Sequence, residues 1–213
     1  MNLTIVRSKE WGQQRMDTGE QILQAALGQF SRRGYHAVSI RDICGEVGIR
    51  ESSLYYHFKN KRALLDALLG RFAEKAGRFT SLLDEGMAQL TELEDEAFLR
   101  VGTRYVQGYL LDPEILTFFG MLRIEREHDP ALAALYREWY FDRPLQFQTR
   151  MFARLSQTGR FPAGQEQRLA LLYLAPILFL YEREFPLDSA EARARLLEAV
   201  RRHLEDFLKE HHP

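Results

Sequence analysis

The chain has 213 residues, of which 46% are hydrophobic and 28% are charged, and its formal net charge is −1. This is the composition of an ordinary globular protein, and it excludes a disordered, collagen-like or uniformly basic chain. No apolar run approaches the roughly 20 residues of a membrane-spanning helix, no signal-peptide pattern opens the chain, and one cysteine excludes an internal disulfide framework, so we expect a cytoplasmic protein with no membrane partner.

The charge is distributed unevenly along the chain. Residues 1–62 contain ten Lys and Arg against six Asp and Glu, whereas residues 63–213 contain nineteen against twenty-four. A basic N-terminal part on an acidic body is the asymmetry expected when only one end of a protein meets nucleic-acid phosphate.

The first helix is expected from Thr18 to Gly34. Thr18 and Gln21 have the spacing of a capping box, and Gly34 is a natural helix stop. Residues 1–16 lack periodicity and carry three basic side chains, so we interpret them as a flexible basic arm. Whether this arm contacts a minor groove or is a solvated tail stays open.

Two short helices follow. Ser39 is positioned to cap the first of them, with Asp42 at the third helical position, and this helix ends near Val47. The second covers Glu51 to His57. Gly48 between them can adopt a left-handed conformation without steric cost, so the pattern predicts a helix-turn-helix whose second helix fits a major groove.

The second helix of this motif has one face for the core and one for a partner. Leu54 lies four residues before Phe58 and faces inward, which turns Ser52 and Tyr56 outward. Tyr55 is interpreted equally well as a packed residue and as a phosphate contact. The outward candidates for DNA contact on this helix are Glu51, Ser52, Ser53, Tyr55, Tyr56 and His57.

Three residues around this helix add charge-based contacts. Arg50 can donate two hydrogen bonds to a guanine, and Glu51 can accept one from a cytosine amino group. Lys61 lies in the first turn of the next helix, where its ammonium and the free backbone amides can bind one phosphate together.

The remainder of the chain is predicted to be helical as well. Asn60 caps a long helix that reaches about Leu83 and joins the N-terminal part to the body. Asp112-Pro113 and Asp129-Pro130 each combine a cap with a proline at the first helical position, and Asp188 opens the last helix. We therefore expect an all-α fold of about nine helices.

Aromatic residues are concentrated in the body, and two prolines lie within helical patterns there. Pro144 and Pro176 are expected to free the carbonyls of Tyr140 and Leu172. Each aromatic residue on its own is more typical of a core, but together they favour a cavity for an apolar ligand whose polar end meets Arg104, Arg123 or Tyr105. The predicted ligand-binding residues are Phe98, Tyr105, Tyr109, Phe118, Phe119, Arg123, Trp139, Tyr140 and Tyr173.

The last two helices are predicted to form a homodimer interface. Leu171, Leu174, Leu178 and a leucine-rich face that ends at Phe207 exceed what one helix can bury against its own body. A four-helix interface with a second copy would cover them.

Residues 18–65 resemble the DNA-binding domain of the TetR family of bacterial transcriptional regulators. The resemblance rests on Ile-Leu-Gln-Ala-Ala-Leu-Gly-Gln-Phe, Arg-Gly-Tyr, Ser-Ile-Arg-Asp-Ile, Val-Gly-Ile, Leu-Tyr-Tyr-His-Phe and Lys-Asn-Lys-Arg-Ala-Leu-Leu. It implies a homodimer on a palindromic operator, usually repressing, that is released by a small ligand. It also implies that Ser39, Arg41, Tyr55, His57 and Lys61 contact phosphates, and that residues 50–53 and Tyr56 face bases. Arg50 and Glu51 depart from the family pattern, and Arg50 removes a helix cap.

These observations give three segments and one preferred function. Residues 1–16 are the arm, residues 17–62 the DNA-binding domain, and residues 63–213 the ligand-binding and dimerisation domain. We predict a ligand-responsive regulator, and the alternative is a constitutive architectural DNA-binding protein. The chain has no nucleophile elbow, no glycine-rich phosphate loop and no metal-spaced ligands, so we expect no enzyme activity, no metal and no cofactor.

Overall fold

The computed structural model describes residues 17–88 and 94–211, and every regular element in these ranges is helical. The elements are α1 (Thr18–Arg33), α2 (Ile40–Val47), α3 (Glu51–His57), α4 (Lys61–Ala88), α5 (Asp95–Tyr105), η1 (Val106–Leu110), α6 (Pro113–Glu125), α7 (Pro130–Arg137), η2 (Glu138–Asp142), α8 (Arg143–Gln157), α9 (Glu166–Glu184) and α10 (Ala190–His211). The π-helical segment η1 continues α5, and η2 joins α7 to α8, so the described chain has nine continuous helices. The all-α prediction is confirmed. No helix among these residues is both long enough and apolar enough to cross a membrane.

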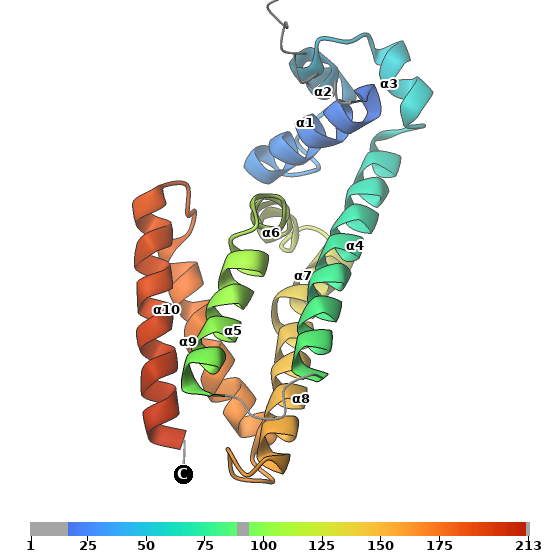
Figure 1. Cartoon of the computed structure of the whole chain (residues 1–213). Coiled ribbons are helices and arrows are strands. Elements are labelled where there is room, and N and C mark those ends of the chain that lie inside the picture. Colours follow the sequence, from blue (N-terminus) through green and yellow to red (C-terminus); the bar gives the residue numbers. More distant parts are fainter. Residues whose placement is uncertain (1–16, 89–93, 212–213) are drawn as a thin grey trace, which may run out of the picture.

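Helices α1, α2 and α3 form a separate head at one end of the molecule (Figure 1). Phe30 from α1, Ile43 from α2 and Leu54 from α3 are fully buried where the three helices meet. Burial of such side chains contributes about 1.5–3 kcal/mol each, which holds two very short helices in place although neither is stable alone.

Helix α4 runs from the head along the body as a single element (Figure 1). The Asn60 side chain accepts a hydrogen bond from the Ala63 amide at 2.8 Å, so the predicted cap is confirmed. The helix has 28 residues and extends past the predicted end at Leu83 to Ala88. The helix therefore connects the head to the body without interruption.

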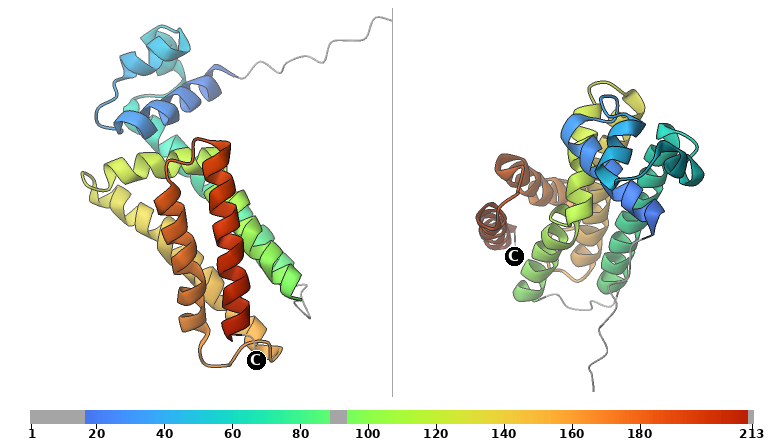
Figure 2. Two further views of the ribbon diagram at one scale, coloured as in Figure 1. Left: turned by 90° about the vertical axis from the view of Figure 1, so that its left-hand side faces the viewer. Right: turned by 90° about the horizontal axis from the view of Figure 1, so that it is seen from above.

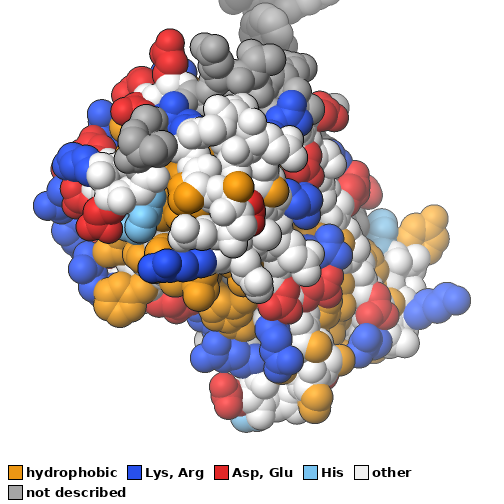
Figure 3. All heavy atoms as spheres, turned by 90° about the horizontal axis from the view of Figure 1, so that it is seen from below, with side chains coloured by type: hydrophobic (Ala, Val, Ile, Leu, Met, Phe, Trp, Pro, Cys, Tyr) orange, Lys and Arg blue, Asp and Glu red, His pale blue; other side chains and the backbone are white. Residues whose placement is uncertain are grey.

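Helices α5 to α10 form the body. Their core contains a cluster of rings from four helices, in which Phe98 packs parallel to Phe207 and edge-on to Tyr173. Helices α9 and α10 lie side by side and make one outer face (Figure 2). At the end of the body away from the head, acidic and basic side chains are interspersed with hydrophobic patches (Figure 3).

Two of the predicted helix caps are wrong. Asp17, not Thr18, occupies the cap position of α1, and its side chain makes no capping hydrogen bond. Ser189, not Asp188, caps α10 by accepting the Ala192 amide at 3.0 Å. In both cases a neighbouring polar residue fits the cap position, and only the backbone conformation decides between them. Asp112 and Asp129 cap α6 and α7 as predicted.

Both helix-disrupting prolines lie near carbonyls that bond to side chains of other elements. The Tyr109 hydroxyl donates to the carbonyl of Trp139 at 2.9 Å, within the η2 segment that precedes Pro144. A ring nitrogen of His203 lies 2.9 Å from the carbonyl of Tyr173, one turn before Pro176. These carbonyls are each one residue away from the predicted Tyr140 and Leu172, whose freed state stays a prediction.

Candidate nucleic-acid interface

The turn between α2 and α3 is built by local interactions. Ser39 and Asp42 form the predicted capping box: the Ser39 hydroxyl oxygen accepts the Asp42 amide, and the Asp42 carboxylate accepts the Ser39 amide at 2.8 Å. These hydrogen bonds hold the pKa of the Asp42 carboxyl below its usual range. Gly48 has φ of 76° and closes α2 by donating its amide hydrogen to the Cys44 carbonyl, so the predicted left-handed turn is confirmed.

Helix α3 presents the outward face that the spacing predicts. Tyr56 is 87% exposed and Tyr55 is 49% exposed, whereas Leu54 is fully buried. Arg50 makes no capping hydrogen bond, as expected for a residue with no short acceptor side chain. The other predicted contact residues that are exposed are Ser39, Arg41, Arg50, Glu51, Ser52, Ser53 and His57. This surface combines hydroxyl and imidazole donors of α3 with the guanidiniums of Arg41 on α2 and Arg50 before α3.

Lys61 has a structural role that the sequence does not indicate. Its ammonium donates to the carbonyls of Tyr35 and Val38 at 2.8 Å and of His36 at 3.3 Å, and it lies 4.4 Å from the centre of the Tyr35 ring. Desolvation lowers the pKa of this ammonium. Because all three of its donors are engaged, a phosphate contact would have to replace one of these bonds.

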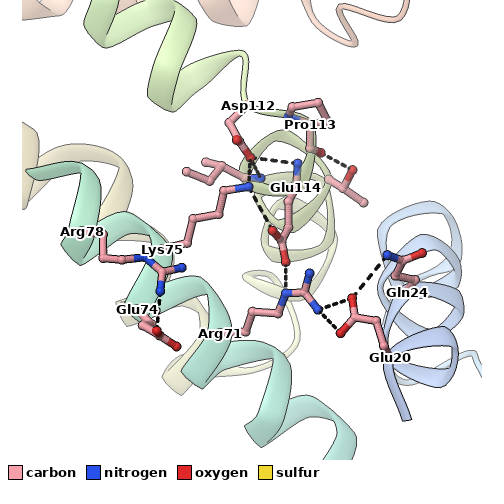
Figure 4. Close-up of polar contacts among 11 residues, drawn as sticks. Glu20, Gln24, Arg71, Glu74, Lys75, Arg78, Asp112, Pro113 and Glu114 are labelled. Carbon is pink, nitrogen blue, oxygen red and sulfur yellow. Dashed lines mark hydrogen bonds and ion pairs between the residues drawn. The ribbon is translucent and has the colours of Figure 1, made fainter. Parts of the chain in front are cut away.

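An ion-pair network connects the head to the body (Figure 4). Arg71 of α4 bonds both to Glu20 of α1, at 2.6 Å for one carboxylate oxygen, and to Glu114 at the start of α6. Lys75, one turn further along α4, pairs with Asp112 at 2.7 Å and with Glu114 at 3.0 Å. Asp112 also caps α6. The network, defined by Glu20, Arg71, Lys75, Asp112 and Glu114, therefore joins three helices at the junction of head and body.

A second contact lies at the other end of α1. Gly34 ends α1 with φ of 84°, and a Cβ atom there would come within 2.6 Å of a carboxylate oxygen of Glu125 on α6. Glu125 is 1% exposed and lies 3.3 Å from a ring nitrogen of His36. Only glycine permits this close approach, so α6 packs directly on the C-terminal end of α1, whereas Arg71 of α4 connects it to Glu20 near the other end.

Most of the predicted ligand-binding residues contact one another in the core of the body, where Tyr109 packs on Tyr105 and Phe119. Tyr105, Tyr109 and Trp139 line a small enclosed space of about 10 Å³, which is close to the volume one water molecule needs. Phe98 and Tyr173 belong to the core beside Phe207. Phe119 contacts both Tyr109 and Tyr140, and Phe118 packs on Phe72, which also contacts Trp139. Arg123 lies among Tyr140, Tyr181 and Phe185 and pairs with Glu182. Most of the aromatic residues are thus core.

Two of the tyrosines at the small space have hydroxyl groups that can donate hydrogen bonds inside the core. Burial raises the pKa of the Tyr105 and Tyr109 phenols, so both are neutral hydrogen-bond donors at physiological pH. Within the described part of the chain the Tyr105 hydroxyl is buried and has no hydrogen-bond partner.

The ion-pair network was not predicted from the sequence. Asp112 was predicted as a helix cap, whereas Glu20, Arg71, Lys75 and Glu114 were assigned no role from the sequence. Glu20 and Arg71 are 51 positions apart, so no local pattern could pair them.

Comparison with known proteins indicates, independently of the geometry, which family the chain resembles. The family model described as bacterial regulatory proteins, tetR family, matches residues 22–68. The HTH-type transcriptional repressor KstR2 of Mycolicibacterium smegmatis is 36% identical over 99 residues, which cover 45% of this chain and 48% of that protein. The matched segment thus spans about half the length of this curated relative.

Solved structures extend the likeness to the body. A Mesorhizobium loti protein described as a TetR-family transcriptional regulator has a TM-score of 0.69 at 21% identity, covering 92% of this chain and 96% of that one. A Saccharomonospora viridis protein described as a transcriptional regulator, in complex with choline, has a TM-score of 0.64 at 24% identity, covering 90% and 95%. At these identities the likeness concerns the fold.

Proposed function

The chain belongs to the TetR family of bacterial regulatory proteins, and from this premise we propose that it is a ligand-responsive repressor. In this proposal a homodimer binds a palindromic operator in the cytoplasm and is released by a small, largely apolar molecule. The observation that carries it is the protruding face of α3, where Tyr56 is exposed while Leu54 anchors the helix. A transcriptional regulator of this family needs no catalytic centre.

We assign the operator contacts by their place on the head. The residues proposed to face bases are Arg50, Glu51, Ser52, Ser53 and Tyr56, and those proposed to contact phosphates are Ser39, Arg41, Tyr55, His57 and Lys61. Ser39 and Lys61 also have bonds within the head, and Lys61 would exchange one of its three bonds for a phosphate contact.

The proposed dimer uses the outer face of α9 and α10 (Figure 2). Leu174, Leu178 and Phe207, which the sequence suggested for this interface, pack inside the body instead. Leu171 and Phe179 are 55% and 65% exposed on the same face of α9, with Leu172 beside them. Their burial against a second copy related by two-fold symmetry is supported by the cost of leaving such side chains in water.

Release by ligand is proposed as a shift between two orientations of α4. The ion-pair network supports it, because it ties α4 to both the head and α6. A ligand that favours a displaced α4 would move the two heads of a dimer away from the ~34 Å spacing of successive major grooves. The choline complex of the Saccharomonospora viridis protein supports a small-molecule site in this fold.

The proposal is tested by selecting binding sites from genomic DNA with the full-length protein and footprinting the selected sites. We expect a palindromic footprint, and we expect a co-purified molecule, identified by mass spectrometry, to lower the affinity for that site. Operator affinity that no bound ligand changes would contradict ligand control and favour the constitutive architectural alternative.

A further inference from the structure

A groove of about 690 Å³ opens between α4 and α5, apart from the small space at Tyr105. Phe79, Leu82 and Leu83 of α4 contribute its apolar wall, and Leu82 is 66% exposed. A volume of this size falls within the roughly 300–1,000 Å³ of small-molecule sites, so the groove suits a small molecule better than a protein segment.

The opposite wall of the groove carries positive charge. Arg100 and Arg104 are exposed, line the groove and lie one turn apart on one face of α5. In residues 17–88 and 94–211 no ion pair or hydrogen bond joins either of them to another residue. Arg201 of α10 also lines the groove, but it is paired with Glu205 at 2.9 Å.

The groove contains one carboxylate, that of Glu96. Arg100 and Arg104, which have no partner among the described residues, and the paired Arg201 therefore leave an excess of positive charge beside an apolar wall. A guanidinium binds a carboxylate or a phosphate through paired hydrogen bonds, and its hydrocarbon stem packs on apolar surface.

We propose that this groove binds an anionic amphiphile, a molecule with an apolar chain and a carboxylate or phosphate head. The chain lies along Phe79, Leu82 and Leu83, and the head bonds to Arg100 and Arg104. This inference rests on the proposed ligand control and names the chemical class of the ligand. It also connects ligand to operator, because one wall of the groove is α4, which begins directly after the recognition helix α3.

The test uses four probes with the same chain and different heads: decanoate, decyl phosphate, decanol and decyltrimethylammonium, each below its micelle-forming concentration. Binding to the full-length protein is measured by calorimetry at two salt concentrations. We expect the two anions to bind at least about tenfold more tightly than the alcohol and the cation, and to weaken as salt rises. The two anions compared with each other distinguish a carboxylate ligand from a phosphate ligand.

Variants locate the site. Arg100→Gln with Arg104→Gln should weaken decanoate about tenfold or more and leave decanol within about twofold, whereas Leu82→Gln should weaken both probes. Arg202→Gln is the matched control, because Arg202 is an exposed arginine of α10 outside the groove. Anion binding that is unchanged in the double variant, or equal for all four heads, would overturn the assignment.

The affinity for the operator is measured in the same samples. This measurement separates the proposal of ligand control from the assignment of the groove. Decanoate should weaken operator binding by the wild type and not by the double variant, and both proteins should bind the operator equally without probe. If decanoate binds through the arginines but never changes operator affinity, ligand control fails while the groove assignment stands. If other molecules release the operator and no decyl probe binds, the groove assignment fails while ligand control stands.

Discussion

At the scale of single residues, several polar groups of the head have a bond within the protein. The Ser39 hydroxyl completes a capping box, and the Lys61 ammonium joins the α1–α2 connection to α4. Tyr56, in contrast, is free to meet DNA. Substitutions should therefore separate residues that build the head from residues that contact the operator.

Replacing Lys61 with methionine should destabilise the protein. The carbonyls of Tyr35 and Val38 lose their donor, and a lost hydrogen bond from a charged group costs about 1.5–3 kcal/mol. Urea unfolding measures the loss. The neighbouring exposed Lys59→Met is the control, and equal stability of the two variants would refute the structural role of Lys61.

Replacing Tyr56 with alanine should weaken operator binding without weakening the fold. The side chain is 87% exposed, so stability should change by no more than about 0.5 kcal/mol. Loss of a base contact should cost about tenfold in affinity for the operator and much less for unrelated DNA. Fluorescence anisotropy with both DNAs measures this, and an equal loss on both would argue for a phosphate contact at Tyr56.

At the scale of elements, α6 and α4 determine how the head is held. Helix α6 contacts the head at Gly34 and reaches Glu20 through Arg71, and α4 carries the central cations of the network. The network residues are about a quarter to a third exposed, so each pair contributes no more than about 1 kcal/mol. Ion pairs of this strength favour one orientation of the head, and the proposed ligand could supply enough binding energy to change it.

Replacing Arg71 with glutamine should remove an acid-sensitive part of the stability. The hydrogen bond from Arg71 holds the pKa of Glu20 below its usual value, so this contribution is present above about pH 4.3 and is lost as the pH falls through the lower folded-state pKa. The variant should be up to about 1 kcal/mol less stable at neutral pH, and the difference should shrink on acidification.

Unfolding by urea at neutral and acidic pH checks this expectation. Arg78→Gln is the matched control, because Arg78 pairs only with Glu74 on its own helix among the described residues. A difference between wild type and Arg71→Gln that stays constant with pH would show that Glu20 is not the partner that matters.

At the scale of the whole molecule, the exposed leucine and phenylalanine of α9 are the basis of the proposed dimer. Phe179→Glu combined with Leu171→Glu should leave the fold intact, since both side chains are exposed, and should place like charges at the two-fold interface. Sedimentation should then give a monomer of 24.9 kDa in place of a dimer, with loss of tight binding to a palindromic site. A wild-type protein that already sediments as a monomer at micromolar concentration would rule the interface out.

The sequence by itself determined the helical fold, the helix-turn-helix and the outward face of α3. These features depend on helical periodicity, on caps such as Ser39 and Asn60, and on the left-handed Gly48, all of which act within a few residues. The sequence did not determine whether Asp17 or Thr18 occupies the cap position of α1, because the choice between neighbouring residues depends on local backbone conformation.

The tertiary structure alone decided which residues meet. Arg71 forms ion pairs with Glu20 and Glu114, and Lys61 donates hydrogen bonds to the α1–α2 connection. Leu174 is buried, whereas Leu171 is exposed. The tertiary structure also packed most of the predicted aromatic ligand set against one another around a space of only about 10 Å³, and it placed Arg100 beside the apolar wall of α4. These pairings join segments far apart in the chain, and their energies depend on distance and burial, which local sequence patterns do not contain.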